Sequence, residues 1–288
     1  MIVATTTILG DVVSNLVGDD GRVETIMPIG ADPHDFEASA QQAALIREAD
    51  LVIANGLGLE EGLVDLIASA EGEGANVLEL APLLDPLPFA GDHGHDEDGD
   101  EAAEPEDDHG DDDPHFWQDP VRMAEAVRLI AQRLAELQIA NPARDWSQRA
   151  ETYAAEIMDA HAANESVLAT VPIERRKLVT NHEAFGYFAD RYRFEVIAVV
   201  VPGGSTLAAP SAGDLADLVE EMKHEGMRAI FAENTNPTAL AEAVAAELDE
   251  QVTVVQLYTD SLGEAGSAAS TYIGLITENA RLVTEALS

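Results

Sequence analysis

Short apolar runs alternate with longer amphipathic segments along the first half of the chain. The runs, each sized for one strand, cover residues 2–6, 23–27, 51–54 and 77–80. The segments between them, near residues 11–17, 40–49 and 60–70, have helical spacing. Strands that alternate with helices in this way predict βαβ units around a parallel sheet.

The second half repeats the alternation. Strand-like runs cover residues 177–180, 194–201, 229–231 and 252–258, and helical segments lie near 184–191, 211–225, 237–250 and 270–286. We therefore predict an α/β protein of two lobes, each with a four-stranded, mostly parallel sheet flanked by helices. The predicted lobes are residues 1–140 and 172–288, with a linking helical region at 141–171.

The helical pattern between the lobes is interrupted once, at Asn141 and Pro142. If residues 144–169 form one helix, it is about 39 Å long at ~1.5 Å per residue. Such a helix would span both lobes as a strut and restrict hinge motion. The alternative is two shorter helices that belong to separate lobes.

The charge of the chain excludes several classes of partner. It has 55 Asp and Glu against 15 Lys and Arg, for a formal net charge of −40. Nucleic-acid binding requires a cationic surface, which this composition does not supply. An anionic membrane surface is disfavoured for the same reason, whereas a cationic ligand suits the field. The chain has no Cys, which excludes disulfides, thiolate metal sites and cysteine nucleophiles.

One acidic segment, residues 91–113, interrupts the first lobe. It contains thirteen acids and three histidines, His93, His95 and His109, with no Lys or Arg. Because it has almost no apolar side chains to bury, we expect a disordered insertion. It is either a solvated acidic loop or an accessory tether that collects divalent cations weakly.

Three other histidines lie where a site is expected. His34 follows the second strand, His182 follows the first strand of the second half, and His115 lies between the acidic segment and a helix. Ligands of open α/β sheets bind at the carboxyl ends of strands, so facing lobes would bring His34 and His182 together. Asp260 follows the last strand in the same way, and Glu233 is an alternative carboxylate.

Three imidazoles and one carboxylate make a four-coordinate zinc site. Their spacing alone does not separate that site from three unrelated loop histidines. Two further histidines fit ordinary helix positions: His161 lies on an apolar helical stripe, and His224 is near the end of a helix.

Four segments together resemble one protein family. They are GADPHDFE at 30–37, PHFWQDP at 114–120, NHEAFGYF at 181–188 and YTDSLG at 258–263. In this order, with an acidic His-rich segment before the second, they are similar to the ZnuA/TroA-like solute-binding proteins of zinc and manganese ABC transporters. The resemblance covers nearly the whole chain.

The resemblance implies two α/β lobes joined by a long rigid helix, with the metal in the cleft between them. It implies the ligands His34, His115, His182 and Asp260. Family members with His at the third position are associated with zinc and those with Glu with manganese, so His182 points to Zn(II). The implied partners are an ABC permease and its ATPase, with a periplasmic zinc chaperone as a further candidate.

The expected protein is therefore a binding protein and not an enzyme, a monomer located in the periplasm. Because Met1 leads directly into the first strand, we expect that a targeting segment has been removed from this sequence. Because this sequence has no Cys, we expect a free periplasmic protein and not a lipoprotein. Three other functions stay open: a manganese-binding protein of the same family, a zinc-buffering or cell-adhesion protein in which the acidic segment matters, and a zinc hydrolase. A hydrolase would use three His ligands and a metal-bound water.

Overall fold

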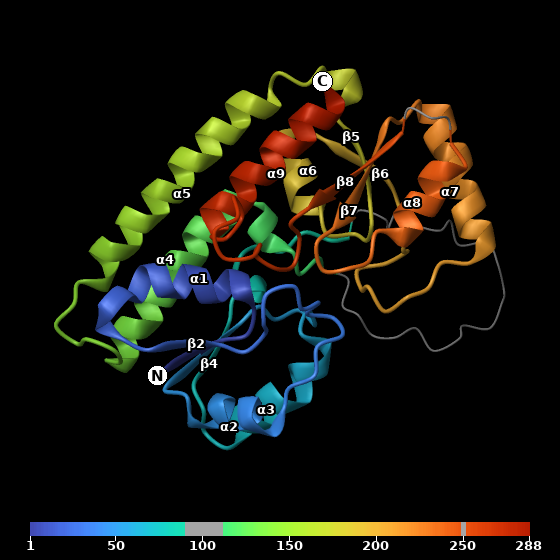
Figure 1. Ribbon diagram of the computed structural model, residues 1–288. Helices are drawn as coiled ribbons and strands as arrows, with labels where there is room; N and C mark the ends of the chain where they lie inside the picture. Colours follow the sequence, from blue (N-terminus) through green and yellow to red (C-terminus); the bar gives the residue numbers. More distant parts are fainter. Residues whose placement is uncertain (90–111, 249–251) are drawn as a thin grey trace, which may run out of the picture.

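The computed structural model describes residues 1–89, 112–248 and 252–288. The chain forms two α/β lobes, each built on one four-stranded parallel sheet, as the alternating pattern predicts (Figure 1). The predicted acidic segment, with His93, His95 and His109, lies outside the described residues except for its last two positions. Within the described ranges, no helix combines the length and the apolar character needed to cross a membrane.

The N-terminal lobe has the strand order β2-β1-β3-β4, and every neighbouring pair is parallel. Its strands are β1 (Ile2–Ala4), β2 (Val23–Thr25), β3 (Leu51–Ala54) and β4 (Val77–Glu79). The chain moves outward from β1 to β2 and then returns to the other side of β1. The carboxyl ends of β1 and β3 therefore form a topological switch point, where such sheets bind ligands.

The C-terminal lobe repeats this arrangement with the order β6-β5-β7-β8. Its strands are β5 (Lys177–Thr180), β6 (Glu195–Val199), β7 (Ala229–Glu233) and β8 (Thr253–Leu257). The switch point lies between β5 and β7. His182 follows β5 and Glu233 is the last residue of β7, so both lie at this point.

The helices match the predicted segments, with shifted ends. They are α1 (Thr7–Val17), α2 (Ala40–Glu48), α3 (Val64–Gly72), α4 (Pro120–Leu137), α5 (Trp146–Leu168), α6 (Gly186–Tyr192), α7 (Ala212–Glu225), α8 (Ala239–Ala246) and α9 (Tyr272–Leu287). The first helix begins four residues earlier than its apolar spacing indicates. The Thr6 side chain accepts a hydrogen bond from Leu9 N and caps the helix, which ends β1 at Ala4.

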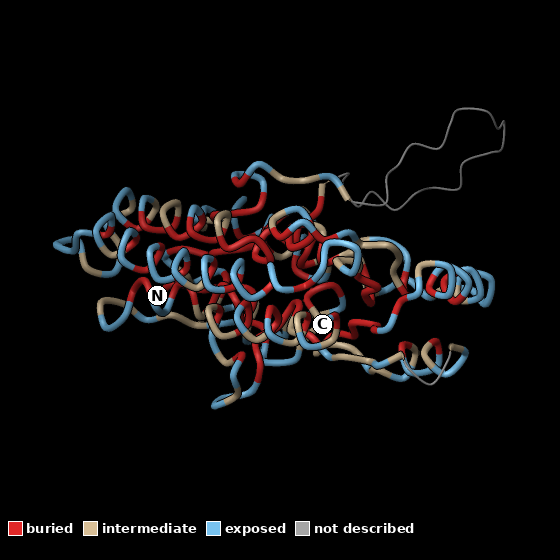
Figure 2. Tube along the Cα trace, turned by 90° about the horizontal axis from the view of Figure 1, so that it is seen from above, coloured by how far each residue is buried: buried red, intermediate tan, exposed pale blue. Residues whose placement is uncertain are grey.

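Helices α5 and α9 run along one side of both lobes (Figure 1). The region expected to hold one long helix or two shorter ones contains the single helix α5. Helix α9 supplies Tyr272 and Leu275 to the hydrophobic core of the N-terminal lobe, and Val283 and Leu287 to a core of the C-terminal lobe. Buried residues lie along the middle of the molecule in both lobes (Figure 2).

Candidate metal centre

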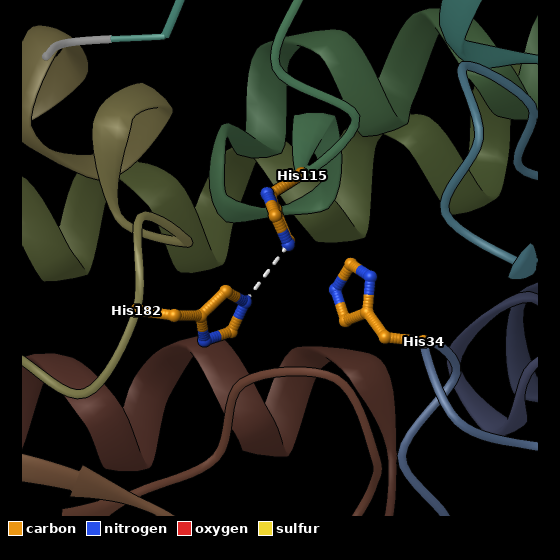
Figure 3. A group of neighbouring side chains, drawn as sticks. All are labelled: His34, His115 and His182. Carbon is orange, nitrogen blue, oxygen red and sulfur yellow. Dashed lines mark hydrogen bonds between the residues drawn. The ribbon is translucent and has the colours of Figure 1, made fainter. Parts of the chain in front are cut away.

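Three histidines from distant parts of the chain meet between the lobes. His34 comes from the loop after β2, His115 directly precedes the short 3₁₀ turn Phe116–Gln118, and His182 comes from the loop after β5. Their ring centroids are 5.0 to 5.7 Å apart, and the rings surround one common space (Figure 3). His115 and His182 have no exposed surface, and His34 is 3% exposed.

Asp260 adds a carboxylate to the three rings. Its Oδ1 lies 4.0 Å from Nε2 of His115, and its Oδ2 lies 3.8 Å from Nε2 of His182. Among the described residues, neither oxygen has a hydrogen-bond partner, and Nε2 of His34 has none either. Buried polar atoms are nearly always paired, so a group of unpaired ones facing each other fits a cation between them. The donor set of three imidazoles and one carboxylate is one that zinc accepts.

The other ring nitrogen of each histidine faces a second carboxylate. Nδ1 of His115 lies 2.7 Å from Asp113 Oδ1, and Nδ1 of His182 lies 2.5 Å from Glu233 Oε1. Nδ1 of His34 is 3.3 Å from an oxygen of Glu61. A proton on Nδ1 that donates to a carboxylate fixes the tautomer, and the Nε2 lone pair is then turned toward the common space.

The sequence pattern did not single out two of these three carboxylates, Asp113 and Glu61. Asp113 was expected to close the solvated acidic segment, but it is buried and accepts hydrogen bonds from both Nδ1 and the backbone N–H of His115. Its position two residues before a candidate ligand was the available clue. Glu61 is separated from His34 by 27 residues, and no spacing rule connects them. Glu233 was an alternative metal ligand, and in the structure it contacts the outward-facing nitrogen of His182.

His115 and His182 are both fully buried, but their surroundings shift their pKa values in opposite directions. Burial opposes protonation of His182, but the charge of Glu233, its hydrogen bond and the charge of Asp260 outweigh burial and raise the pKa of His182 to about 9. Burial and the neighbouring His182 and His34 lower the pKa of His115 well below its ordinary value. At neutral pH the Nε2–H of charged His182 therefore donates to neutral His115 Nε2, 3.1 Å away. A divalent cation would replace that proton.

The segment that carries His115 is held from both lobes. Asn55, at the end of β3, donates to the carbonyl oxygen of Pro114 at 2.9 Å. From the C-terminal lobe, the Tyr187 hydroxyl donates to the carbonyl oxygen of Asp113 at 2.8 Å. Trp117 Nε1 donates to the carbonyl oxygen of Thr259, directly before Asp260, also at 2.8 Å. These contacts fix two of the four converging side chains relative to each other.

An ion pair with a buried carboxylate extends this connection. Asp119, which caps the first turn of α4, accepts two hydrogen bonds from Arg191 of α6, at 2.8 and 2.6 Å, and one from Arg122 at 2.8 Å. Such paired contacts between guanidinium groups and a carboxylate are strong and directional. The pair joins the two lobes four residues beyond His115.

The remaining described histidines lie elsewhere. His161 is buried on α5, where its Nδ1 is 3.1 Å from the Tyr192 hydroxyl, and His224 is exposed near the end of α7. Neither approaches the converging group formed by His34, His115, His182 and Asp260.

Comparisons with known proteins agree with this geometry. A family model described as ZnuA, zinc-uptake complex component A, periplasmic, matches residues 2–286. The zinc-binding protein TroA of Treponema pallidum is 30% identical over all of this chain and 89% of its own length. The manganese-binding lipoprotein MntA of Halalkalibacterium halodurans is 28% identical over all of this chain and 88% of its own.

Solved structures show the same architecture. The periplasmic zinc-binding protein TroA from Treponema pallidum superposes with a TM-score of 0.85 at 27% identity, covering all of this chain and 98% of that one. Because the family model spans almost every residue and the fold matches over the full length, this chain belongs to the ZnuA family of periplasmic metal-uptake components.

Proposed function

We propose that this protein binds Zn(II) between its two lobes and delivers it to the membrane permease of an ABC importer. His34, His115 and His182 would coordinate the ion through Nε2, and Asp260 through its carboxylate. The protein acts as a carrier in this proposal, and zinc is its cargo.

The observation that carries the proposal is the set of inward-facing atoms without partners. The Asp260 oxygens and His34 Nε2 are buried and unpaired within the described part of the chain, and they face the His115 and His182 rings. A nitrogen atom of each of the three histidines lies within 4.8 Å of the others. Each ring is also oriented from outside by a carboxylate, as in metal sites whose histidines must present a lone pair.

The choice of zinc rests on the chemistry of the donors. Imidazole suits zinc, whereas manganese prefers sites richer in oxygen. Zinc also follows manganese in the general order of increasing affinity for divalent ions. Manganese is the alternative, since the MntA relative is named for it.

The donor set also argues for carriage over hydrolysis. A catalytic zinc site has three protein ligands and keeps a fourth position for water. Asp260 would occupy that position here. A zinc hydrolase would need this carboxylate to leave the metal, and a buffering or adhesion protein would need the acidic segment more than the buried centre.

The partners follow from the family. The protein would act in the periplasm, as a monomer, with an ABC permease and its ATPase, and a zinc chaperone could supply the metal. His93, His95 and His109 of the acidic segment would form an accessory collecting site.

A competition titration tests the proposal. Metal-free protein is titrated with zinc and, separately, with manganese against a chelator, and the same is done with His182→Ala. The expected result is one tight zinc site, weaker manganese binding, and loss of the tight site in the variant. Weak, multiple binding that His182→Ala leaves unchanged would refute the proposal. Tighter manganese than zinc binding would reassign the cargo.

A further inference from the structure

The loop that carries His34 also makes contacts outside the metal centre. We call residues 28–34 the His34 loop; it belongs to the N-terminal lobe. Within it, Asp32 accepts a hydrogen bond from the backbone N–H of His34 at 3.0 Å through Oδ1. Its other oxygen, Oδ2, accepts from Thr206 Oγ1 at 2.6 Å and from Asn236 Nδ2 at 3.1 Å. Thr206 and Asn236 both belong to the C-terminal lobe.

The two donors come from separate loops of the C-terminal lobe. Thr206 lies after β6, and Asn236 lies between β7 and α8. One carboxylate therefore joins the backbone of a candidate ligand to two loops of the opposite lobe. Hydrogen bonds to an ionised acceptor are about twice as strong as bonds between neutral groups. The bonds from Thr206 and Asn236 to the Asp32 carboxylate are therefore stronger than neutral bonds of the same length.

Neighbouring contacts support the same closed arrangement. Gly30 N donates to the Ser261 hydroxyl at 2.8 Å, directly beside Asp260. Phe89 of the N-terminal lobe lies against Gly204, so closely that a Cβ atom there would fall 2.1 Å from the ring. The loop that carries Thr206 is thus in contact with the N-terminal lobe at two points.

Asp32 is also close to the metal centre. Ligand-type atoms of Asp32, His34 and Asp260 lie within 4.8 Å of one another. This arrangement of the lobes brings two carboxylates together, which is unfavourable unless a cation lies nearby. Once Asp260 holds a divalent ion, the repulsion is offset and Asp32 can keep its bonds to Thr206 and Asn236.

We propose that Asp32 is a positioning residue that fastens the His34 loop to the C-terminal lobe when metal is bound, and so sets the rate at which the metal leaves. Asp32 does not need to coordinate the ion for this role. The inference rests on the proposed function, since it concerns the retention of the cargo at the same centre.

The test measures zinc dissociation from the loaded, full-length protein after excess chelator is added. Asp32→Ala removes both bonds between the lobes and should accelerate dissociation roughly 10- to 100-fold. Thr206→Val and Asn236→Ala each remove one donor and keep the Asp32 charge, so each should accelerate it about 3- to 10-fold. The matched controls are Asp35→Ala, an exposed acid of the same region, and Thr152→Val, an exposed threonine of α5. Both should dissociate at the wild-type rate.

The variants separate fastening from electrostatic attraction. If only Asp32→Ala accelerates dissociation, the residue acts through its charge on the ion and the proposal is wrong. Unchanged rates in Thr206→Val and Asn236→Ala overturn it even if Asp32→Ala does not fold. The proposal expects Thr206→Val and Asn236→Ala to leave the melting temperature of the metal-free protein unchanged. A lower melting temperature would show a general loss of stability instead. Weak zinc binding by the wild type would instead refute the proposed function.

Discussion

The role of Glu233 can be tested by removing its carboxylate. Its Oε1 accepts hydrogen bonds from Nδ1 of His182 at 2.5 Å and from the His182 backbone N–H at 3.1 Å. The residue is 1% exposed, so Glu233→Ala leaves two buried donors without a partner and without access to water. We expect this variant to bind zinc about 100-fold more weakly, the upper end of the effect of groups that orient a ligand.

Glu233→Gln gives a smaller expected effect. The amide keeps an oxygen that can accept from Nδ1, so the ring stays oriented, but the negative charge that makes His182 a stronger donor to the metal is lost. We expect the affinity to fall by up to about tenfold, which corresponds to ~1.4 kcal/mol. Glu247→Ala, an exposed acid on the same lobe, is the matched control and should bind as the wild type does.

The assay is zinc competition with a chelator, together with the absorption spectrum of the cobalt-loaded protein. The spectrum should keep the same coordination in Glu233→Ala, because in the proposed site Glu233 orients His182 and does not coordinate the ion. An affinity of Glu233→Ala within about threefold of the wild type would refute the orienting role. A change of coordination number in the cobalt spectrum would show that Glu233 is a ligand.

Three further predictions concern protons, the acidic segment and the lobe connection. Burial raises the pKa of Asp113 to about 8 and that of Asp260 to about 7, and the pKa of His182 is about 9, so zinc binding at pH 7 should release protons. Zinc affinity should therefore rise with pH up to about 9; heats of binding that are independent of the buffer's ionisation enthalpy would contradict this. Deletion of residues 92–110 should preserve the tight zinc site in a chelator titration, whereas deletion of 92–113 should weaken it about 10- to 100-fold, because it also removes Asp113 from His115. Asp119→Ala should lower the free energy of unfolding by about 1.5–3 kcal/mol, because Arg191 and Arg122 lose a charged partner but keep access to water, and Arg191→Ala should lower it less. Denaturant unfolding of the metal-free variants measures both changes, and equal losses would contradict the reasoning.

The architecture could be predicted from the sequence because the strands of each sheet are parallel. Parallel strands are connected through helices, so the alternation of apolar runs and amphipathic segments follows the order of elements directly. The same regularity places residues that follow strands at one edge of a sheet. That is why His34, His182 and Asp260 were candidates before their distances were known, with Glu233 as the alternative carboxylate; the family resemblance implied the ligand set.

Other parts of the centre depend on contacts that have no sequence pattern. Glu61 reaches His34 only because the loop after β3 returns beside the loop after β2. Asp113 was grouped with the acidic segment because its neighbours in sequence are acidic, while its burial is decided by Tyr187 and His115. Thr206 and Asn236 lie in loops and no sequence pattern marks them, because their contact with Asp32 depends on how the two lobes face each other. Interactions between lobes are therefore the main information that the one-dimensional pattern lacks.

The placement of α9 has a consequence for how the protein folds. Its 16 residues are the last helix of the chain, yet Tyr272 and Leu275 complete a core that begins at Ile2. The larger core therefore depends on contacts between the two ends of the chain, which form slowly because a very long loop must close first. Until α9 docks, the apolar surfaces of α1 and α5 that it covers stay exposed.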